Sequence, residues 1–375
     1  MARVFSGMKP TGDATLGSLL GALRPWVDAQ GPESVYCVVD LHALTLPQDP
    51  EVLRRDTLEL AMLILAVGID PDVSILFVQS HVHEHAEMAW LMECTAGVGE
   101  LRRMTQFKDK SARAEAGGGF VSGALFTYPA LMAGDILLYD TEEVPVGDDQ
   151  RQHVELTRDL AERFNARYGP TFAVPRAVVR PAGARVMDLQ DPLRKMSKSE
   201  DSPAGTILLL EEPAAVARKI KRAVTDTGSE VRYDPRTKPG VSNLLSILAA
   251  CTGRTPEAVA DGSTQDGPGK AETAEAVTEV LAPVQARCRE LQADPAETVR
   301  ILAHGADRAQ AVAARTWREP RRPSASSAGR VVSPSLPLFA LGYPVAVAVI
   351  ARWVPVVQGG ARPGSRPTPP PWAPS

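Results

Sequence analysis

Cysteine is scarce in this sequence, and its placement excludes several classes of protein. The four cysteines of the 375-residue chain stand at positions 37, 94, 251 and 288, with no C-x-x-C pair. This spacing argues against a disulfide framework or a zinc knuckle and for a reducing compartment. The N-terminus also lacks the apolar stretch of roughly 7 to 15 residues that a signal peptide needs. We therefore expect a cytoplasmic protein.

Long apolar runs are also lacking. The run at residues 338–351 is shorter than the roughly 20 residues of a membrane span and contains Pro344, so we expect no membrane partner. It lies in a tail, residues 319–375, that holds 12 of the 32 prolines and one acidic residue. This composition predicts a disordered extension or the product of a shifted reading frame.

Positive charge is in slight deficit, because the formal net charge is −4, but basic residues gather locally. Residues 101–113 and 216–222 each carry a basic run. A solvated helix face explains either run taken alone. Contact with a phosphate backbone is the alternative, since such contacts depend on local Lys and Arg density.

The pattern of apolar residues predicts an α/β protein. Short apolar runs at residues 2–6, 35–39 and 74–79 alternate with segments of helical period, which indicates a parallel sheet. We expect a helix at 50–67, with Asp49 and Gly68 as its caps, and another that begins near Asp148 and stops at Gly169. After residue 205 the pattern indicates helices only, over residues 212–224, 241–252, 268–291 and 294–317.

Two segments are suited to hold phosphate groups. Residues 193–201, LRKMSKSED, bring Arg194, Lys195 and Lys198 together in a loop, from which ammonium groups can reach phosphates as mobile point charges. An exposed basic loop without a ligand explains this segment equally well. The pattern of residues 5–23 predicts a strand end, a Gly/Pro-rich turn and a helix that begins near Thr15. Backbone N–H groups at such a helix start can bind an anion.

Together these segments resemble the nucleotide-binding signatures of class I aminoacyl-tRNA synthetases. Residues 15–18, TLGS, are similar to the HIGH element, and residues 195–199 match KMSKS in full. The finer resemblance is to the bacterial tryptophanyl-tRNA synthetases, and it extends over residues 1–318. The segments that carry it are 38–45, 99–111, 127–165, 183–189 and 238–245.

The resemblance implies an aminoacyl-tRNA synthetase with two domains, a Rossmann-like catalytic domain at residues 1–205 and a helical tRNA-binding domain at residues 206–318. The tail at residues 319–375, which its composition predicts to be disordered, lies outside the resemblance. The implied enzyme activates L-tryptophan with ATP, releases pyrophosphate and transfers tryptophan to the 3′ end of tRNA(Trp). It would be a homodimer that uses Mg²⁺ bound through the ATP phosphates, with no metal ligand from protein side chains.

The resemblance also implies site residues. For ATP they are Lys9, Pro10, Thr11, Gly17, Ser18, Gly147, Asp148, Asp149, Val186, Lys195, Met196, Ser197, Lys198 and Ser199. For tryptophan they are Phe5, Gly7, His42, Tyr128, Met132, Asp135, Val144, Val146 and Gln150. For tRNA they are Arg102, Arg103, Lys108, Lys110 and Arg113. Lys195 and Lys198 would be catalytic, because they would neutralise charge on the leaving pyrophosphate.

Asp135 also stands out without the resemblance. It lies in the apolar run ALMAGDILLY, where a carboxylate is costly to bury unless donors surround it. An ion pair in the core or a helix cap would account for it. The resemblance favours the tryptophan indole N–H as the donor. The histidines of HVHEH, residues 81–85, we interpret as surface residues rather than a metal site, and His153 as structural.

Two residues depart from the family pattern inside the ATP site. Ser18 stands where Asn or His is usual, and Lys9 where Gln is usual. Lys9 raises the hypothesis of an auxiliary, inhibitor-tolerant copy of the enzyme, with neutral drift as the alternative. A tyrosyl-type synthetase and a paralogue that no longer charges tRNA are the other hypotheses.

Overall fold

The structure, a computed structural model, describes residues 2–108, 120–147, 150–178, 185–196, 202–226, 231–262 and 269–318. The chain divides into two compact units, Met1–Pro334 and Ser335–Ser375, and every described residue belongs to the first. The tail at 319–375 lies outside the described residues. Within them, no helix is both long enough and apolar enough to cross a membrane.

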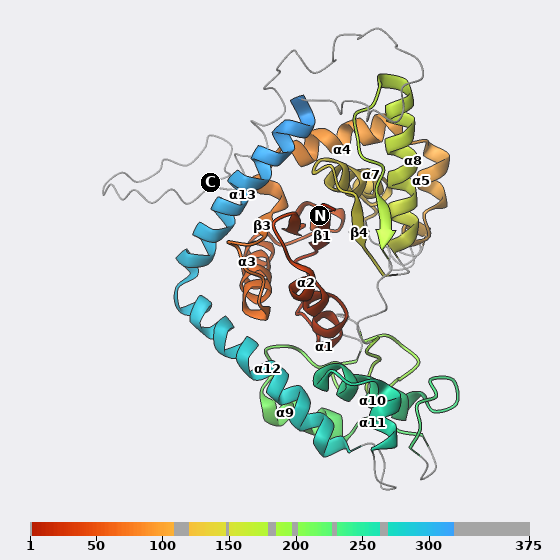
Figure 1. Cartoon of the computed structure of the whole chain (residues 1–375), viewed down its shortest axis with the longest axis vertical. Helices are drawn as coiled ribbons and strands as arrows, with labels where there is room; N and C mark the ends of the chain where they lie inside the picture. The colour runs from red at the N-terminus through yellow and green to blue at the C-terminus, as the bar shows by residue number, and fades with distance from the viewer. Residues whose placement is uncertain are drawn as a thin grey trace, which may run out of the picture. The chain divides into compact units, whose positions relative to one another are not determined.

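One parallel sheet organises the N-terminal half of the chain (Figure 1). In the described residues its strands are β1 (Val4–Met8), β2 (Ser34–Val38), β3 (Ile75–Val78), β4 (Glu143–Pro145) and β5 (Arg176–Val178), in the order β3-β2-β1-β4-β5. The chain moves outward from β1 to β3 and then returns to β4. Ligands of open parallel sheets bind at the carboxyl ends of the strands beside such a reversal.

Helices follow the strands and fill the C-terminal part of the described chain. The first group is α1 (Leu16–Ser18), the π-helical turn η1 (Leu19–Leu23), α2 (Arg24–Ala29), the 3₁₀ turn η2 (Leu41–Thr45), α3 (Pro50–Val67), the 3₁₀ turn η3 (Gln79–His81), α4 (Glu84–Thr95), α5 (Val98–Arg103), α7 (Gly123–Leu137) and α8 (Arg151–Tyr168). The second group is α9 (Pro213–Lys221), α10 (Pro239–Thr252), α11 (Pro256–Asp261), α12 (Lys270–Ala293) and α13 (Pro295–Arg318).

The sequence predicted most of these elements for the right physical reasons. Asp49 caps α3 by accepting hydrogen bonds from the N–H groups of Glu51 and Val52, and Gly68 ends the helix at a φ of 120°. Gly169, at a φ of 93°, ends α8 in the same way. The predicted α/β fold class with following helices is confirmed. The short strands β4 and β5 and the helices α4, α7 and α11 were not predicted.

The last helix, α13, returns to the edge of the sheet. A Cβ on Gly305 would lie 1.8 Å from the carbonyl oxygen of Leu76 in β3, so only glycine allows this close approach. Arg308 donates to the carbonyl oxygens of Pro71 and Ser74, and the latter bond is 3.1 Å long. The edge strand β3 is thus covered by a helix, which protects its unpaired backbone groups.

A single apolar core joins the sheet side of the fold to the C-terminal helices. It contains Leu16 of α1 and Ile64 of α3, together with Leu244 of α10 and Leu281 of α12, each exposed by 2% or less. Val186, from the segment between β5 and α9, belongs to the same core. The segment that contains Lys195 is therefore attached to a rigid base.

Asn243 of α10 fixes the position of that segment. Its side chain makes two hydrogen bonds to the backbone of Met187. Oδ1 accepts from the N–H of Met187 at 2.8 Å, and Nδ2 donates to the carbonyl of Met187 at 2.9 Å. Met187 pairs in turn with Lys195 across an isolated antiparallel bridge, and Met196 donates to the carbonyl of Val186 at 3.0 Å. Residues 186–196 therefore form a small hairpin held by α10.

We predict that Asn243→Ala loosens this hairpin. The substitution leaves two backbone groups of Met187 without their side-chain partner, at a cost of about 1–3 kcal/mol for each group that is left buried. Amide hydrogen exchange followed by mass spectrometry should show faster exchange in peptides that cover residues 186–196.

Asn165 offers a matched control, because both the oxygen and the nitrogen of its side-chain amide are also hydrogen-bonded to backbone groups. Its Oδ1 accepts from the N–H groups of Thr171 and Phe172, and its Nδ2 donates to the carbonyl of Phe172. Asn165→Ala should lower the melting temperature without faster exchange at residues 186–196. Unchanged exchange at 186–196 in Asn243→Ala would contradict the anchoring role.

Candidate active site

The helix α7 carries three of the predicted tryptophan-site residues on one face. Tyr128, Met132 and Asp135 are four and three residues apart, a spacing that aligns side chains along a helix. The same helix lies very close to α4, because a Cβ on Gly134 would be 3.1 Å from the backbone nitrogen of Ala89. This approach brings the buried face of α4 to Asp135.

Asp135 is the centre of a buried polar cluster. The residue is 1% exposed, and its carboxylate accepts three hydrogen bonds. His85 Nδ1 and Gln79 Nε2 lie 2.6 and 2.7 Å from Oδ1, and His42 Nε2 lies 2.8 Å from Oδ2. Burial alone would raise the pKa of this carboxyl, but the hydrogen bonds from His42 and His85 hold the pKa below its ordinary value. Asp135 is therefore a buried anion.

The sheet supplies the partners of Asp135 from the carboxyl ends of its strands. Gln79 follows β3 directly, and His42 lies in η2, just beyond β2. Phe5 of β1 stacks on Tyr139 with ring centroids 5.5 Å apart and an interplanar angle of 8°. Gly7, next along β1, is exposed, and a Cβ there would come within 2.8 Å of Val39 Cγ1. Of the predicted residues, His42 thus lies beyond the carboxyl end of a strand, where ligands of parallel sheets bind, and Phe5 and Gly7 lie within β1.

Tyr128 extends the cluster towards α8. Its hydroxyl lies 2.9 Å from His153 Nε2, and its ring meets His42 edge-on at a centroid distance of 6.3 Å. Burial raises the pKa of Tyr128 to about 12, so the phenol stays protonated at neutral pH. His153 is buried. Gln150 occupies the N-cap position of α8, three residues before His153, and its side chain makes no capping hydrogen bond.

The remaining tryptophan-site candidates differ in burial. Val144 of β4 is buried, whereas Met132 and Val146 are partly exposed. Because β4 pairs with β1 through Glu143 and Val4, Val144 lies beside the strand that contains Phe5. Together with Asp135 they make up a candidate set in which apolar side chains accompany one fixed anion, the composition typical of small-molecule sites.

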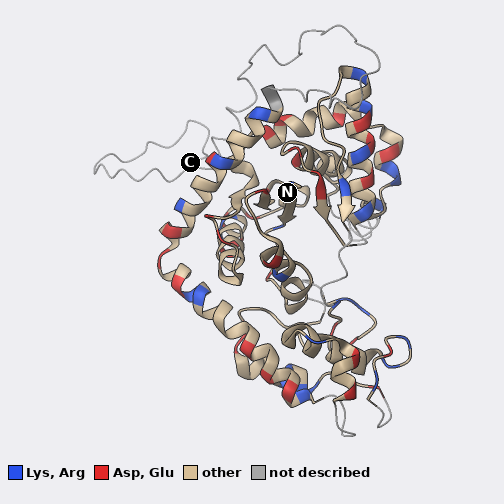
Figure 2. Ribbon diagram, in the orientation of Figure 1, with Lys and Arg blue, Asp and Glu red and all other residues tan. Residues whose placement is uncertain are grey.

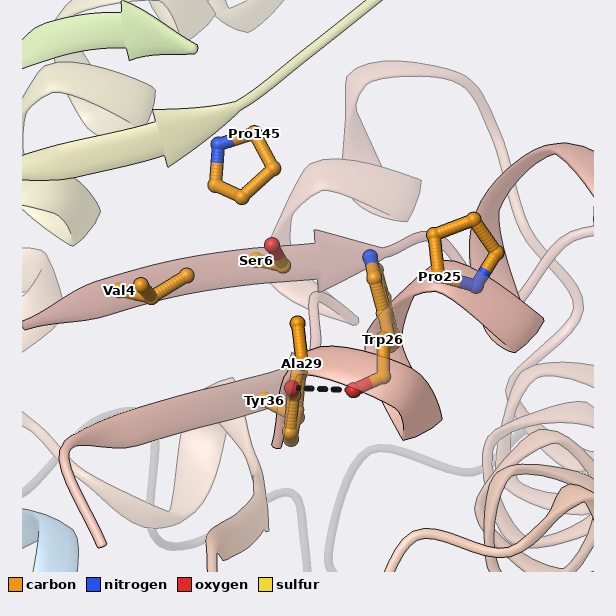
Figure 3. A pocket seen from close by; sticks show the side chains of 7 residues that line it. All are labelled: Val4, Ser6, Pro25, Trp26, Ala29, Tyr36 and Pro145. Carbon is orange, nitrogen blue, oxygen red and sulfur yellow. Dashed lines mark hydrogen bonds between the residues drawn. The ribbon is translucent and has the colours of Figure 1, made fainter. Parts of the chain in front are cut away.

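A small cavity lies on the other face of β1 (Figure 3). It has a volume of about 20 Å³, enough for one water molecule, and Ser6, Trp26 and Tyr36 are among its lining residues. Tyr36 donates its hydroxyl hydrogen to the carbonyl of Trp26 at 2.8 Å (Figure 3). Side chains alternate between the two faces of a strand, so this cavity is separate from the face of Phe5. It is too small to hold an amino acid.

The two predicted phosphate-binding segments meet in the structure. A Cβ on Gly17 would lie 3.5 Å from the carbonyl oxygen of Met196, which is ordinary van der Waals contact. The start of α1 is also bonded to the chain beyond the loop, since Leu16 donates to the carbonyl of Ile207 at 2.9 Å. The TLGS segment and the first residues of KMSKS, 180 positions apart in the sequence, are therefore neighbours.

Ser18 has a local role that the sequence did not reveal. The Thr15 hydroxyl accepts from the N–H of Ser18 at 3.2 Å, and the Ser18 hydroxyl accepts from the N–H of Thr15 at 3.5 Å, which completes a capping box. The helix then continues through the π-helical turn η1, a distortion that is frequent at functional sites. Serine at this position thus stabilises the helix start itself.

Several predicted site residues lie outside the described residues. These are Asp148, Asp149, Ser197, Lys198 and Ser199 of the nucleotide set, and Lys110 and Arg113 of the tRNA set. Of the others, Lys195 and Gly147 are exposed, Pro10, Val186 and Met196 are buried, and Lys9, Thr11, Gly17 and Ser18 are partly exposed.

The described residues of the predicted tRNA set lie on or near α5, which is held by α8. Arg102 and Arg103 are exposed at the end of α5, and Lys108 is exposed shortly after it. Arg163 of α8 holds α5 through Glu100, with Nη2 2.6 Å from Oε1, and this contact lowers the pKa of Glu100. Figure 2 shows basic and acidic residues mixed along α8 and α12 rather than gathered in one stripe.

The interpretation of residues 81–85 as surface histidines is wrong for His85. This residue is 0% exposed, and both ring nitrogens are hydrogen-bonded, to Asp135 and to Tyr139. His81 and His83 are exposed. Sequence reasoning also missed Gln79, for which a polar residue at the end of an apolar strand was the available signal. In the described ranges, no three His, Cys, Asp or Glu side chains are grouped as a metal site requires.

Comparison with known proteins agrees with this geometry. Residues 1–282 match the family described as tRNA synthetases class I (W and Y). A protein of Streptomyces avermitilis named tryptophan--tRNA ligase 1 is 55% identical over 315 residues, which cover 84% of this chain and 95% of that protein.

Two solved structures are similar in fold as well as sequence. Tryptophanyl-tRNA synthetase from Mycoplasma pneumoniae superposes with a TM-score of 0.78 at 36% identity, over 84% of this chain and 95% of the other. The enzyme of Campylobacter jejuni, whose structure is described as complexed with ADP and tryptophan, gives a TM-score of 0.70 at 32% identity. The match covers 84% of this chain and 98% of that one. This chain belongs to the bacterial tryptophanyl-tRNA synthetases, a branch of the class I aminoacyl-tRNA synthetase family.

Proposed function

We propose that this chain activates L-tryptophan with ATP and transfers it to tRNA(Trp), with Asp135 as the group that recognises the indole. The observation that carries the assignment is a buried, ionised carboxylate that is hydrogen-bonded to residues just beyond the carboxyl ends of β2 and β3. Ligands of this fold class bind at these strand ends. Tryptophan is the one amino acid whose side chain offers an indole N–H to such an acceptor. Ligation of tryptophan is also the function named for the Streptomyces avermitilis relative.

Asp135 can accept one further donor. Each carboxylate oxygen has two acceptor positions, and the hydrogen bonds found here use two on Oδ1 and one on Oδ2. Oδ2 is also the oxygen that faces His42, whose side chain is 12% exposed. The indole would enter beside His42 and Tyr128, with Phe5, Gly7, Met132, Val144 and Val146 around the ring and Gln150 near the ammonium group.

The reaction requires positioning more than acid or base catalysis. The tryptophan carboxylate attacks the α-phosphorus of ATP in line, the bond to the bridging oxygen breaks, and pyrophosphate leaves. The resulting anhydride is then attacked by the 3′-terminal ribose hydroxyl of the tRNA, and AMP is released. Lys195 and Lys198 would neutralise the charge that develops on pyrophosphate.

ATP would lie between the two phosphate-binding segments. The contact between Gly17 and Met196 supports this assignment, because one nucleotide could then touch both segments. On one side would be Lys9, Pro10, Thr11, Gly17 and Ser18, with Gly147, Asp148, Asp149 and Val186 around the adenosine and Lys195 to Ser199 at the phosphates. Mg²⁺ would accompany the phosphates of ATP and supply positive charge there, without a cluster of protein carboxylates.

A homodimer fits the exposed apolar side chains of α4 and α5. Trp90 is 65% exposed and Val98 59% exposed, and a second copy would cover both side chains. The acceptor end of the tRNA would lie near Arg102, Arg103 and Lys108, and the helical domain at 206–318 of the second copy would meet the anticodon. A cytoplasmic location follows from the reaction, which uses tRNA.

Replacement of Asp135 tests the amino-acid site. Asp135→Ala should lose on the order of 2–4 kcal/mol of transition-state binding, because it removes the acceptor and leaves the buried donors unpaired. In ATP–pyrophosphate exchange, kcat/KM for tryptophan should fall by about 30-fold or more. Asp159→Ala, which removes an exposed carboxylate on α8, is the control. Parent-like exchange by a folded Asp135→Ala protein would refute the assignment.

Replacement of the loop lysines tests the nucleotide site. Lys195→Ala and Lys198→Ala should lower kcat by about 10²–10³-fold and change KM for tryptophan little, because the ammonium groups act on charge that develops in the transition state. Arg194→Ala, in the same loop, should be close to the parent. Loss confined to KM for ATP would show instead that the lysines bind only ground-state ATP.

Lys9 tests the hypothesis of an auxiliary, inhibitor-tolerant enzyme. Lysine has three donors, no acceptor and a full charge, so it cannot replace both hydrogen-bond functions of glutamine. An indole-containing tryptophan analogue that uses this contact should inhibit Lys9→Gln more strongly than the parent, while KM for tryptophan changes less. An inhibition constant that stays within about twofold, or ~0.4 kcal/mol, would favour neutral drift.

A further inference from the structure

The ring of His85 is held by contacts with three side chains, those of Asp135, Tyr139 and Phe77. Its ring is fully buried between Phe77 and Tyr139, with centroid distances of 5.7 and 5.5 Å. Nδ1 lies 2.6 Å from Asp135 Oδ1, and Nε2 lies 2.8 Å from the Tyr139 hydroxyl. Rotation of the ring would break both contacts.

Asp135 determines which nitrogen of His85 carries the proton, because an ionised carboxylate only accepts and Nδ1–H must therefore donate to it. In a neutral imidazole Nε2 is then an acceptor, and the Tyr139 hydroxyl can donate to it. The phenol ring of Tyr139 is itself fixed, since it is 0% exposed and stacks on Phe5. A chain of hydrogen bonds thus leads from Tyr139 through His85 to Asp135.

This chain determines how the carboxylate is turned. Oδ1 accepts from both His85 and Gln79, so it points into the protein. Oδ2 then points towards His42, the more exposed partner. A carboxylate without the inner donors could rotate about its Cβ–Cγ bond, and its acceptor would no longer be fixed in one direction.

We infer that His85 is the positioning residue that aims Oδ2 of Asp135 at the indole N–H, and thereby sets the discrimination between tryptophan and an isostere without that N–H. His85 does not touch the amino acid in this arrangement. It acts through Asp135, and the inference rests on the proposed function of this site. Purely structural packing of the ring is the competing explanation.

Two amide variants separate these explanations. The Asn side chain overlays the near part of a histidine and can put a donor at the position of Nδ1, whereas Gln reaches the position of Nε2. His85→Asn therefore keeps the contact with Asp135 and loses the one with Tyr139. His85→Gln does the reverse. Both variants lose the ring and its packing, so packing alone would affect them similarly.

The experiment measures ATP–pyrophosphate exchange by the full-length chain with L-tryptophan and with 3-(3-benzothienyl)-L-alanine, in which sulfur replaces the indole N–H. The readout is the ratio of the two kcat/KM values, with KM for ATP and the melting temperature as controls. We expect His85→Asn to keep the parent ratio within about threefold. His85→Gln should lower it by about tenfold or more, with KM for ATP unchanged.

Tyr139→Phe is the third variant, because it keeps the stacked ring and removes only the hydroxyl. Nδ1–H of His85 still donates to Asp135, so the ratio should stay within about threefold of the parent, as in His85→Asn, and this can be measured even if His85→Gln fails to fold. A tenfold loss in Tyr139→Phe, or equal losses in the Asn and Gln variants, would overturn the inference. A parent protein without tryptophan-dependent exchange would instead overturn the proposed function.

Discussion

A carboxylate that is removed from water needs hydrogen-bond donors around it. Asp135 is such a carboxylate, and the elements packed around it must supply the donors. The donors come from three different elements: η2 gives His42, the end of β3 gives Gln79, and α4 gives His85. Burying an unpaired charge would cost several kcal/mol, so these elements can pack only in the arrangement that satisfies it. The packing of these elements and the proposed recognition of tryptophan therefore depend on the same contacts.

The two segments proposed to bind ATP are held instead by hydrogen bonds to backbone groups. The start of α1 is bonded to Ile207, the hairpin at 186–196 is held by Asn243, and Leu189 donates to the carbonyl of Gly205 at 2.8 Å. Gly205 has no room for a side chain, because a Cβ would meet the Asp188 carboxylate at 1.8 Å. The segments before and after residues 195–199 are thus hydrogen-bonded to each other, and the second of them is hydrogen-bonded to the start of α1. This rigid base suits a reaction that requires exact alignment of two substrates.

The sequence predicted features that arise from local chemistry. Asp49 and Gly68 bound α3 as expected, and the apolar runs of the first three strands were recognisable. Recognition of the family also led to Asp135. His85 was misjudged because its burial comes from the close approach of α4 and α7 at Gly134, which no local pattern reveals.

The same limit applies to the elements and residues that were missed. The strands β4 and β5 are three residues long and exist because they pair with β1 and with each other. The role of Asn243 depends on a partner 56 positions away in the sequence. Ser18 is a local exception, since the spacing of Thr15 and Ser18 permits a capping box that the family comparison had obscured.

The most direct test of the account is the environment of the indole N–H in the bound state. Tryptophan labelled with ¹⁵N in the indole ring should give, in complex with this protein, a ¹H–¹⁵N signal shifted downfield and protected from exchange with water. A hydrogen bond to a buried carboxylate requires both effects. An indole signal with the shift and exchange rate of free tryptophan would contradict the role of Asp135.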